Sequence, residues 1–354
     1  MQEHSHQWQA LAAKVAFLSR LSSYDKSAIV NTDNIEIIET HMSYVFFTHA
    51  YAYKLKKPVL LPQVDFVSLA SRYANTVREL QINQRLAAGI YLQALPLCLT
   101  PNEQYCLLDS PEHVSTYARQ GGTVIDWLLK MRRLPRQALL DQAWSAAGFQ
   151  VLDVVPAADH LAAFYRSAAP VTKTPDAYVR MLRDQIINNI QNLSNPVYQL
   201  DLAQLDNIRR AQLSCLAALR PELSCRISAG RLVDGHGDLK PEHICLTSPP
   251  VIIDRLELDP IARLADPVAE LSLLHIECQR LGHVGVAEVF LRRYQQLTGD
   301  RPGQLLLAFY RSLAAARRGK IAAWHVDDCR IADKHYWRAA AGEYLQAAAQ
   351  IIRG

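Results

Sequence analysis

The stretch that decides the fold of this chain reads Val233-Asp234-Gly235-His236-Gly237-Asp238-Leu239-Lys240-Pro241-Glu242-His243. The short apolar run Ile244-Cys245-Leu246 follows it, and a second run, Val251-Ile252-Ile253-Asp254, ends in a carboxylate. Short branched runs separated by polar and proline residues are typical of strands. The pattern therefore predicts a polar loop that contains Asp238, followed by two short strands, the second of which ends at Asp254.

This arrangement is typical of phosphoryl-transfer loops. Such a loop runs His-x-Asp, then four residues, then a metal-binding Asn, and a second acidic ligand stands on the next strand. We expect Asp238 to orient an acceptor hydroxyl and to take its proton. We expect Asp254 to bind the magnesium that bridges nucleotide phosphates. The alternatives are an Asp that caps a turn and an ordinary Asp at a strand end.

Two other residues of the loop carry predictions. Lys240 is expected to neutralise charge on the phosphoryl group in transfer, unless it is a lysine that only faces solvent. His243 stands where the pattern has Asn. Neutral imidazole prefers borderline metals to Mg²⁺. His243 is therefore a metal ligand (with Mn²⁺ as the alternative to Mg²⁺), a hydrogen-bond partner of Asp238 or of a metal-bound water, or a sign of weak or absent activity.

The bulk properties are those of a soluble, reduced enzyme. The chain has 354 residues, half of them hydrophobic, which suits one large domain or two modest ones. A net charge of +4 predicts no strong nucleic-acid or membrane field. The seven cysteines form no Cys-x-x-Cys pair, and neither a secretory signal nor a bilayer-spanning apolar run is present. We therefore expect a cytoplasmic protein without nucleic-acid or membrane partners.

The N-terminal part alternates in character. Residues 1–30 have helical spacing of apolar groups, and residues 68–88 predict a second helix whose apolar surface is Tyr73, Val77, Leu80, Ile82 and Leu86. Strands are predicted at Ile35–Glu39, Tyr44–Phe47, Tyr51–Lys56, Leu95–Leu97, Tyr105–Leu108 and Trp127–Met131.

From Gln137 onward the chain is predicted to be mostly helical. The expected helices span 157–168, 175–193, 200–219, 265–281, 284–297, 302–323 and 331–352. Arg132–Pro135 is predicted to cross into a second domain. The fold class is α+β and two-lobed: a strand-rich lobe of residues 1–131, with a helical extension at 1–30, and a helical lobe of residues 132–354 that holds the catalytic loop 234–254.

The third predicted strand carries a candidate phosphate-binding lysine. Side chains alternate along a strand, so Ala52 and Lys54 share one face, where a small residue leaves room for a base and the lysine reaches phosphates. Lys56 is on the same face and is the rival, while Lys57 points the other way. Glu79, on the following helix, is expected to pair with Lys54. The alternatives are a solvated basic edge strand and an exposed helix glutamate.

Beyond these motifs, one late helix carries a basic run. It either faces an anionic substrate or is a solvated face, and its members are Arg311, Arg317, Arg318 and Lys320.

With these residues in hand, the chain resembles the aminoglycoside phosphotransferase-like branch of the protein-kinase-like superfamily, and within it an uncharacterised bacterial group. The similarity runs from about Ile35 to Ala322, and its stretches are Glu39–Val45, Tyr51–Val59, Arg78–Asn83, Lys130–Pro135, His236–Asp238, Tyr310–Ser312 and Arg317–Lys320. The family has a metal-binding Asn where this chain has His243. It has a later Asp-Leu-Ala where this chain has Glu270-Leu271-Ser272.

The resemblance implies a two-lobed protein-kinase-like fold and an ATP-dependent phosphotransferase that acts on a hydroxyl of a small molecule. ATP is then expected against the 129–134 hinge, including Met131. The glycine-free hairpin Thr40–Ala50 would meet phosphates through its backbone and Ser43. Some relatives carry a second ATPase domain, and the Gly-x-x-x-x-Gly-Lys-Ser/Thr run of such a domain is not found in this sequence.

Two other functions stay open at this point. One is a pseudokinase-like module that binds nucleotide or acts only through protein contacts, favoured by His243 and the glycine-free hairpin. The other is a metal-dependent hydrolase that uses His236, His243 and Asp254, which would leave the N-terminal pattern unexplained. The histidines at 41, 275, 325 and 335 have no ligand spacing with His243, so a zinc centre is not expected.

Overall fold

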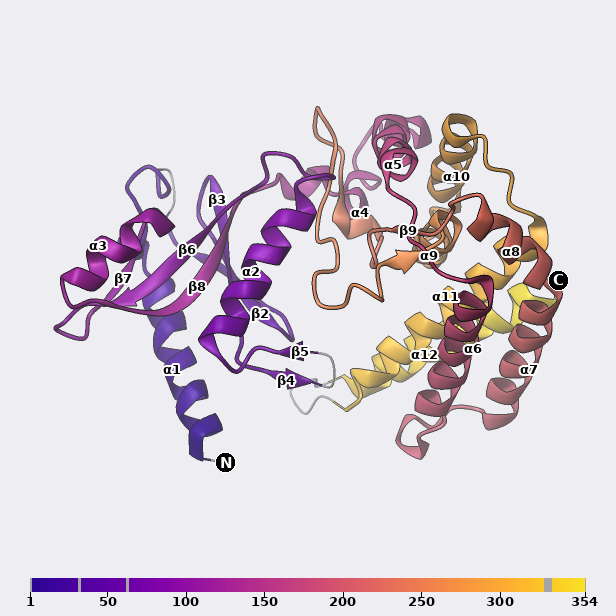
Figure 1. Ribbon diagram of the computed structural model, residues 1–354, viewed down its shortest axis with the longest axis horizontal. Coiled ribbons are helices and arrows are strands. Elements are labelled where there is room, and N and C mark those ends of the chain that lie inside the picture. The colour runs from indigo at the N-terminus through magenta and orange to yellow at the C-terminus, as the bar shows by residue number, and fades with distance from the viewer. Residues whose placement is uncertain (1, 31–32, 62–63, 328–332, 354) are drawn as a thin grey trace. The chain divides into compact units, whose positions relative to one another are not determined.

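The computed structural model describes residues 2–30, 33–61, 64–327 and 333–353 (Figure 1). The chain divides into two compact units. The first unit comprises Met1–Leu139 and Val251–Pro260, and the second comprises Leu140–Pro250 and Ile261–Gly354. Val251–Pro260, predicted to lie in the second lobe, joins the first unit through its contacts.

The first unit is built on a six-stranded antiparallel sheet with the strand order β1-β2-β3-β8-β6-β7. All six predicted strands are present, and β6 and β8 are longer than expected. Their bounds are β1 Glu36–Glu39, β2 Ser43–Phe47, β3 Tyr51–Lys56, β6 Tyr91–Leu99, β7 Tyr105–Leu107 and β8 Thr123–Arg132. A small pair, β4 (Leu60–Leu61) and β5 (Val64–Asp65), was not predicted.

Helices cover both faces of this sheet. The predicted N-terminal helix is α1 (Gln2–Leu18), which ends well before residue 30. The predicted second helix is α2 (Leu69–Asn83), which is capped by Ser68 and ends before residue 88. Leu11 and Leu18 of α1 join Tyr53, Leu55 and other side chains of one sheet face in an apolar cluster. Helix α2 packs against β6 and β8. The short helix α3 (Val114–Arg119) was not predicted.

The buried face of α2 differs from the prediction. Of the apolar residues expected to bury it, Tyr73 is 41% exposed. The residues of α2 that are buried are polar and recur at helical spacing: Arg72, Thr76, Glu79 and Asn83. Apolar periodicity failed here because the sheet face opposite α2 carries charged partners, which make a polar helix face stable.

The second unit is mostly helical, and all seven predicted helices are present within a few residues. They are α5 (Val155–Ser167), α6 (Pro175–Leu193), α7 (Leu202–Ala218), α9 (Pro267–Arg280), α10 (Val284–Thr298), α11 (Gln304–Trp324) and α12 (Lys334–Arg353). The predicted start of the last helix, at 331–332, lies outside the described residues. Helices α4 (Leu140–Ala143) and α8 (Arg220–Ser228) were not predicted.

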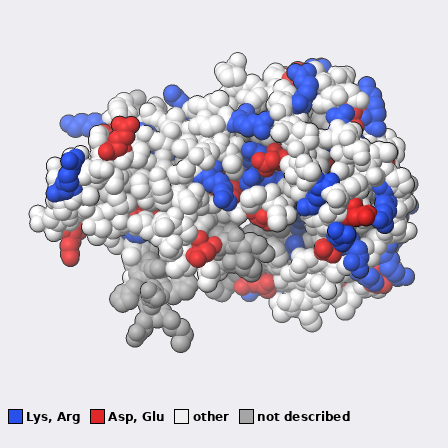
Figure 2. Space-filling view, viewed as in Figure 1, with Lys and Arg blue, Asp and Glu red and all other residues white. Residues whose placement is uncertain are grey.

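Short strands interrupt these helices around the motif. β9 (Val233–Asp234) pairs with β12 (Leu264–Ala265), and the two predicted strands after the loop are β10 (Ile244–Cys245) and β11 (Val251–Ile252). Among the described helices, none combines the length and the apolar character that crossing a membrane requires. Basic and acidic groups are interspersed on the face shown in Figure 2.

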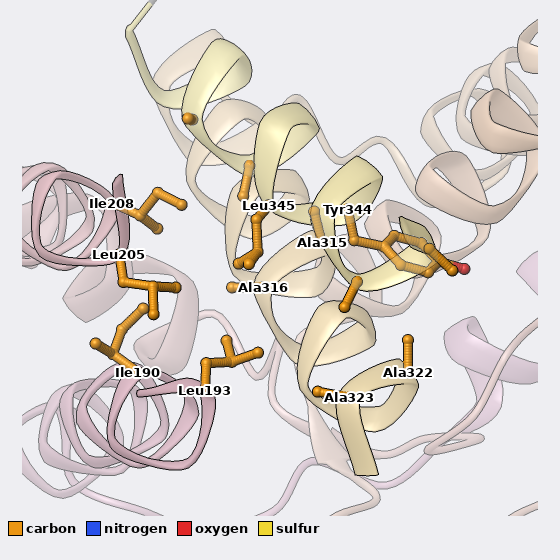
Figure 3. Close-up of a cluster of buried hydrophobic side chains, with 14 of the residues drawn as sticks. Ile190, Leu193, Leu205, Ile208, Ala315, Ala316, Ala322, Ala323, Tyr344 and Leu345 are labelled. Atoms are coloured by element: carbon orange, nitrogen blue, oxygen red, sulfur yellow. The ribbon is translucent and has the colours of Figure 1, made fainter. Parts of the chain in front are cut away.

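The core of the second unit forms where α6, α7, α11 and α12 meet. Figure 3 shows Leu345 of α12 among Ala316, Leu193 and Leu205, and all four side chains belong to one buried cluster. Small residues let α11 and α12 approach closely: a Cβ added to Gly319 would lie 3.3 Å from the carbonyl oxygen of Ala341. The alanine-rich stretch of α11 is thus explained by close helix packing.

We expect Leu345→Ala to lower the free energy of unfolding by about 2–5 kcal/mol, because Leu345 is 1% exposed and its neighbours cannot fill the cavity fully. Urea denaturation followed by circular dichroism measures this. Leu305→Ala is the control, since Leu305 is 48% exposed and should cost far less. Equal losses in both variants would contradict this account of the core.

We also expect His275 to weaken the fold in acid. Burial, together with the charge of Arg311, lowers the pKa of His275 to about 4, and its Nδ1 is buried without a hydrogen-bond partner. Between pH 6.5 and 4, His275 is therefore protonated in the unfolded chain but mostly neutral in the folded chain. The stability of the fold falls as the pH falls through this range. His275→Gln should reduce the drop in melting temperature between pH 7 and pH 4.5. An unchanged drop in His275→Gln would contradict this account.

Candidate active site

The first group of functional side chains is built on β3 and α2. Lys54 Nζ lies 2.7 Å from Glu79 Oε1 and 3.5 Å from Asp254 Oδ1. Glu79 is 1% exposed, whereas the side chain of Asp254 is 46% exposed. The pairing of Lys54 with Glu79 that the sequence predicts is therefore confirmed, and it brings the lysine beside the exposed carboxylate of Asp254.

Lys56 occupies a different place from Lys54. Its Nζ lies 2.6 Å from Glu79 Oε2 and 3.0 Å from Glu257 Oε1, and its side chain is 2% exposed. The two lysines thus hold one oxygen each of the Glu79 carboxylate. We call Lys54, Lys56, Glu79, Asp254 and Glu257 the lysine–carboxylate cluster. Glu257 was missed in the sequence, where only its place three residues after Asp254 could have marked it.

The pKa values of the cluster follow from burial and mutual charge. Burial lowers the pKa of Lys54, but Glu79, then Asp254 and Glu257, raise it well above the usual value. Burial favours the neutral form of Glu79, yet the two lysines lower its pKa overall. Burial, reinforced by the charge of Glu79, raises the pKa of Glu257. The cluster therefore keeps a charged Lys54 at neutral pH.

Asp254 is held in an unusual backbone conformation. Its φ is 59°, in the left-handed region that residues other than glycine seldom adopt. Its backbone N–H donates to the Tyr91 hydroxyl at 2.8 Å, and the next N–H, that of Arg255, donates to Asn83 Oδ1 at 2.9 Å. Strain of this kind persists only where neighbours hold it, and it is frequent at functional sites.

The structure places the other two predicted nucleotide contacts as follows. Met131 of β8 is opposite Ala52 on one side and Tyr91 on the other, so it shares the sheet face of Lys54. Ser43 is 1% exposed, and its hydroxyl lies 3.0 Å from Thr40 Oγ1 in the turn before β2. This burial speaks against direct contact between the Ser43 hydroxyl and a phosphate.

The second group lies in the loop of residues 234–243. Lys240 Nζ is 3.0 Å from Asp238 Oδ2 and 3.0 Å from Glu242 Oε1. Burial raises the pKa of Asp238, but the charges of Lys240, His243 and Arg317 outweigh it and lower the pKa below its usual value. Asp238, with 26% of its side chain exposed, is thus a carboxylate at neutral pH.

Glu270 holds the backbone of this loop. Its carboxylate accepts hydrogen bonds from the N–H groups of His236 (2.9 Å) and Gly237 (2.6 Å) and from the Tyr165 hydroxyl (2.6 Å). A Cβ at Gly235 would lie 2.5 Å from Glu270 Oε2, and Gly237 has a φ of 89°, so both positions require glycine. The sequence marked Glu270 only as a departure from Asp and did not reveal this role.

His243 is part of the same loop and is 8% exposed. Its Nδ1 lies 2.8 Å from the backbone oxygen of Asp238. A carbonyl oxygen only accepts, so Nδ1 of His243 donates this hydrogen bond. The sequence left several roles open for His243. The one that the structure shows is a hydrogen bond to Asp238, made to its backbone oxygen.

Known proteins resemble this chain in sequence or in fold, but no family model matches it. Uncharacterised proteins of Mycobacterium tuberculosis and Mycobacterium bovis are 25% identical over 303 residues, which cover 84% of this chain and 56% of theirs. The chain therefore spans about half the length of the curated relatives it matches.

Two solved structures carry the fold assignment. A choline/ethanolamine kinase family protein from Mesorhizobium loti superposes with a TM-score of 0.53 at 14% identity, over 90% of this chain and 92% of that one. Aminoglycoside 2'-phosphotransferase-IIIa, solved as a GDP complex, gives 0.51 at 15% identity, over 93% and 96%. The chain has the two-lobed protein-kinase-like fold. The fold class expected from the sequence is thereby confirmed.

Over the described ranges, no three His, Cys, Asp or Glu side chains are grouped so that they could hold a metal ion. Magnesium commonly needs only one or two carboxylates beside phosphate oxygens and water, which the exposed Asp254 can supply. His236 is fully buried, and its Nδ1 accepts from the Asp238 N–H at 3.3 Å, so the described residues do not support the metal-dependent hydrolase.

We expect Lys56→Met to destabilise the kinase-like fold by about 3–5 kcal/mol, because it leaves the buried carboxylates of Glu79 and Glu257 without their shared cation. Lys54→Met should lower the stability less, because Glu79 still has Lys56 as its ion-pair partner and the exposed carboxylate of Asp254 stays solvated. Thermal unfolding of both variants, with the exposed Lys26→Met as control, measures the difference. A larger loss for Lys54→Met would reverse the roles assigned to the two lysines.

Proposed function

We propose that this chain is an ATP-dependent phosphotransferase that transfers the γ-phosphoryl group to a hydroxyl of a small molecule. The observation that carries the proposal is the Lys54–Glu79 ion pair at 2.7 Å with the exposed Asp254 carboxylate 3.5 Å from the lysine. Kinase-like enzymes need a lysine held by a glutamate to orient phosphates and a carboxylate to bind the metal. The kinase-like fold and its small-molecule kinase neighbours support the same reaction class.

Each residue then has a stated task. Lys54 binds the α and β phosphates, Glu79 fixes Lys54, and Met131 contacts the nucleotide at the end of β8. Asp254 holds magnesium, which neutralises phosphate charge when bound.

Asp238 acts on the acceptor. The acceptor oxygen bonds to the γ-phosphorus, the bond from that phosphorus to the ADP oxygen breaks, and the hydroxyl proton passes to the Asp238 carboxylate. The lowered pKa of Asp238 suits a residue that orients the hydroxyl and takes the proton late. Lys240, 3.0 Å from Asp238, offsets negative charge on the phosphoryl group.

The first test is thermal stability with ATP or GTP, Mg²⁺ or Mn²⁺, and each nucleotide with each metal. GTP is included because one structural neighbour was solved with GDP. A ligand at a hundredfold excess over its Kd stabilises the native state by about 2.7 kcal/mol. A shift that needs nucleotide and metal together supports the proposal. No shift in any condition would favour an interaction module without nucleotide binding, the pseudokinase-like reading motivated by His243.

We expect Asp238→Asn to lower turnover about 10²–10⁴-fold while the melting temperature and the shift with nucleotide and metal remain. The amide can still accept a hydrogen bond but cannot take the proton. ADP release with an accepted substrate measures turnover. Glu288→Gln, an exposed carboxylate of the same unit, is the control. Full turnover in Asp238→Asn would remove this residue from the mechanism.

A further inference from the structure

The basic residues of α11 differ in the groups that they contact. Arg318 is paired: its Nε lies 2.7 Å from Glu277 Oε1, and Glu277 also accepts the Tyr344 hydroxyl at 2.7 Å. Arg317 instead reaches the 234–243 loop, where its Nη2 donates to the backbone oxygen of Gly237 at 3.2 Å. Gly237 directly precedes Asp238. Arg317 therefore lies next to the candidate catalytic residue.

Lys320 lies one turn further along α11 and contacts polar and aromatic groups. Its Nζ is 3.3 Å from Asn188 Oδ1 and 5.0 Å from the centre of the Trp324 ring. Burial, with the charge of Arg317, lowers the pKa of Lys320 to about 8. The lysine is thus still mainly charged at pH 7, and it is electrostatically coupled to Arg317.

The carboxylates near the loop are already used. Asp238 and Glu242 share Lys240, and Glu277 is held by Arg318. Over the ranges that the structure describes, neither Arg317 nor Lys320 has a carboxylate within ion-pair distance. Asp238 attracts Arg317 only from beyond ion-pair distance, and the two partly buried cations repel each other. An anion that both cations contact would offset that repulsion.

We propose that the acceptor carries, besides the hydroxyl that is phosphorylated, a phosphate or carboxylate group that Arg317 and Lys320 bind. The inference rests on the proposed function and specifies its substrate class. The planar guanidinium of Arg317 suits two oxygens of such a group, and Lys320 adds a point charge. Trp324, 45% exposed beside Lys320, offers an apolar surface to the body of the acceptor. A polycationic acceptor would instead be repelled by both side chains.

The first arm of the test measures anion binding without nucleotide, so it does not depend on turnover. Titration calorimetry with inorganic phosphate and with glycolate compares the wild type with Arg317→Gln and Lys320→Gln. Each variant should weaken binding about tenfold or more, because a charge-assisted hydrogen bond is lost. Arg292→Gln, an exposed arginine of α10, removes the same charge and should bind as the wild type. Comparing phosphate with glycolate distinguishes the two anionic groups.

The second arm measures ADP release with matched acceptors: glycerol against glycerol 3-phosphate, ribose against ribose 5-phosphate, and glucosamine against gluconate. The anionic member should be preferred in the wild type, and Lys320→Gln should raise its KM more than it lowers kcat. Unchanged anion binding in both variants, or turnover of glucosamine without turnover of any anionic compound, overturns the proposal. Anion binding that depends on Arg317 and Lys320, with no turnover of any compound, supports the anion site while counting against the proposed function.

Because Arg317 also contacts the loop backbone, Arg317→Gln can disturb folding. Lys320→Gln has no such contact and decides the question alone in that case. Arg317→Lys keeps the charge but loses the planar fork, so it should bind phosphate with intermediate strength. If Arg317→Gln folds and binds anions normally but has lost turnover, the arginine only holds the loop, and the inference is wrong.

Discussion

The first unit depends on one buried carboxylate, Glu79, shared by two lysines of a single strand. A buried charge is tolerated only when it is paired and hydrogen-bonded, so the strand must present Lys54 and Lys56 to the same face, two residues apart. Helix α2 must in turn present its polar stripe rather than its apolar residues. The alternation of side chains along β3 and the polar face of α2 therefore follow from the same requirement, which is to pair the buried Glu79 carboxylate.

The same constraint separates the roles of the two lysines. Lys56 is enclosed between Glu79 and Glu257 and neutralises both. Lys54 can therefore share Glu79 and still keep a side toward Asp254, whose carboxylate is exposed. A single lysine would have to balance two buried carboxylates and serve a ligand at once. With Lys56 present, Lys54 pairs with one buried carboxylate instead of two.

In the second unit, too, a buried carboxylate holds a segment in place, but it pairs with backbone N–H groups instead of lysines. The 234–243 loop has little regular structure, so its backbone donors need partners from outside it. Glu270, from the first turn of α9, accepts two of them and fixes the loop that carries Asp238. An aspartate would be one methylene shorter, and Gly235 leaves room for the longer side chain to approach. Glu270 thus holds the backbone of the loop in place.

The sequence by itself determined the order of strands and helices, the candidate pair Lys54 and Glu79, and the loop around Asp238, because these rest on local periodicity and on motifs of fixed spacing. Only the tertiary structure decided which lysine lies beside Asp254, that Glu257 completes the lysine–carboxylate cluster, and that Glu270 binds the backbone of the 234–243 loop. These contacts join side chains that are far apart in the chain, such as Lys56 and Glu257. Their partners are chosen by packing and by the need to balance buried charge, which no local pattern records.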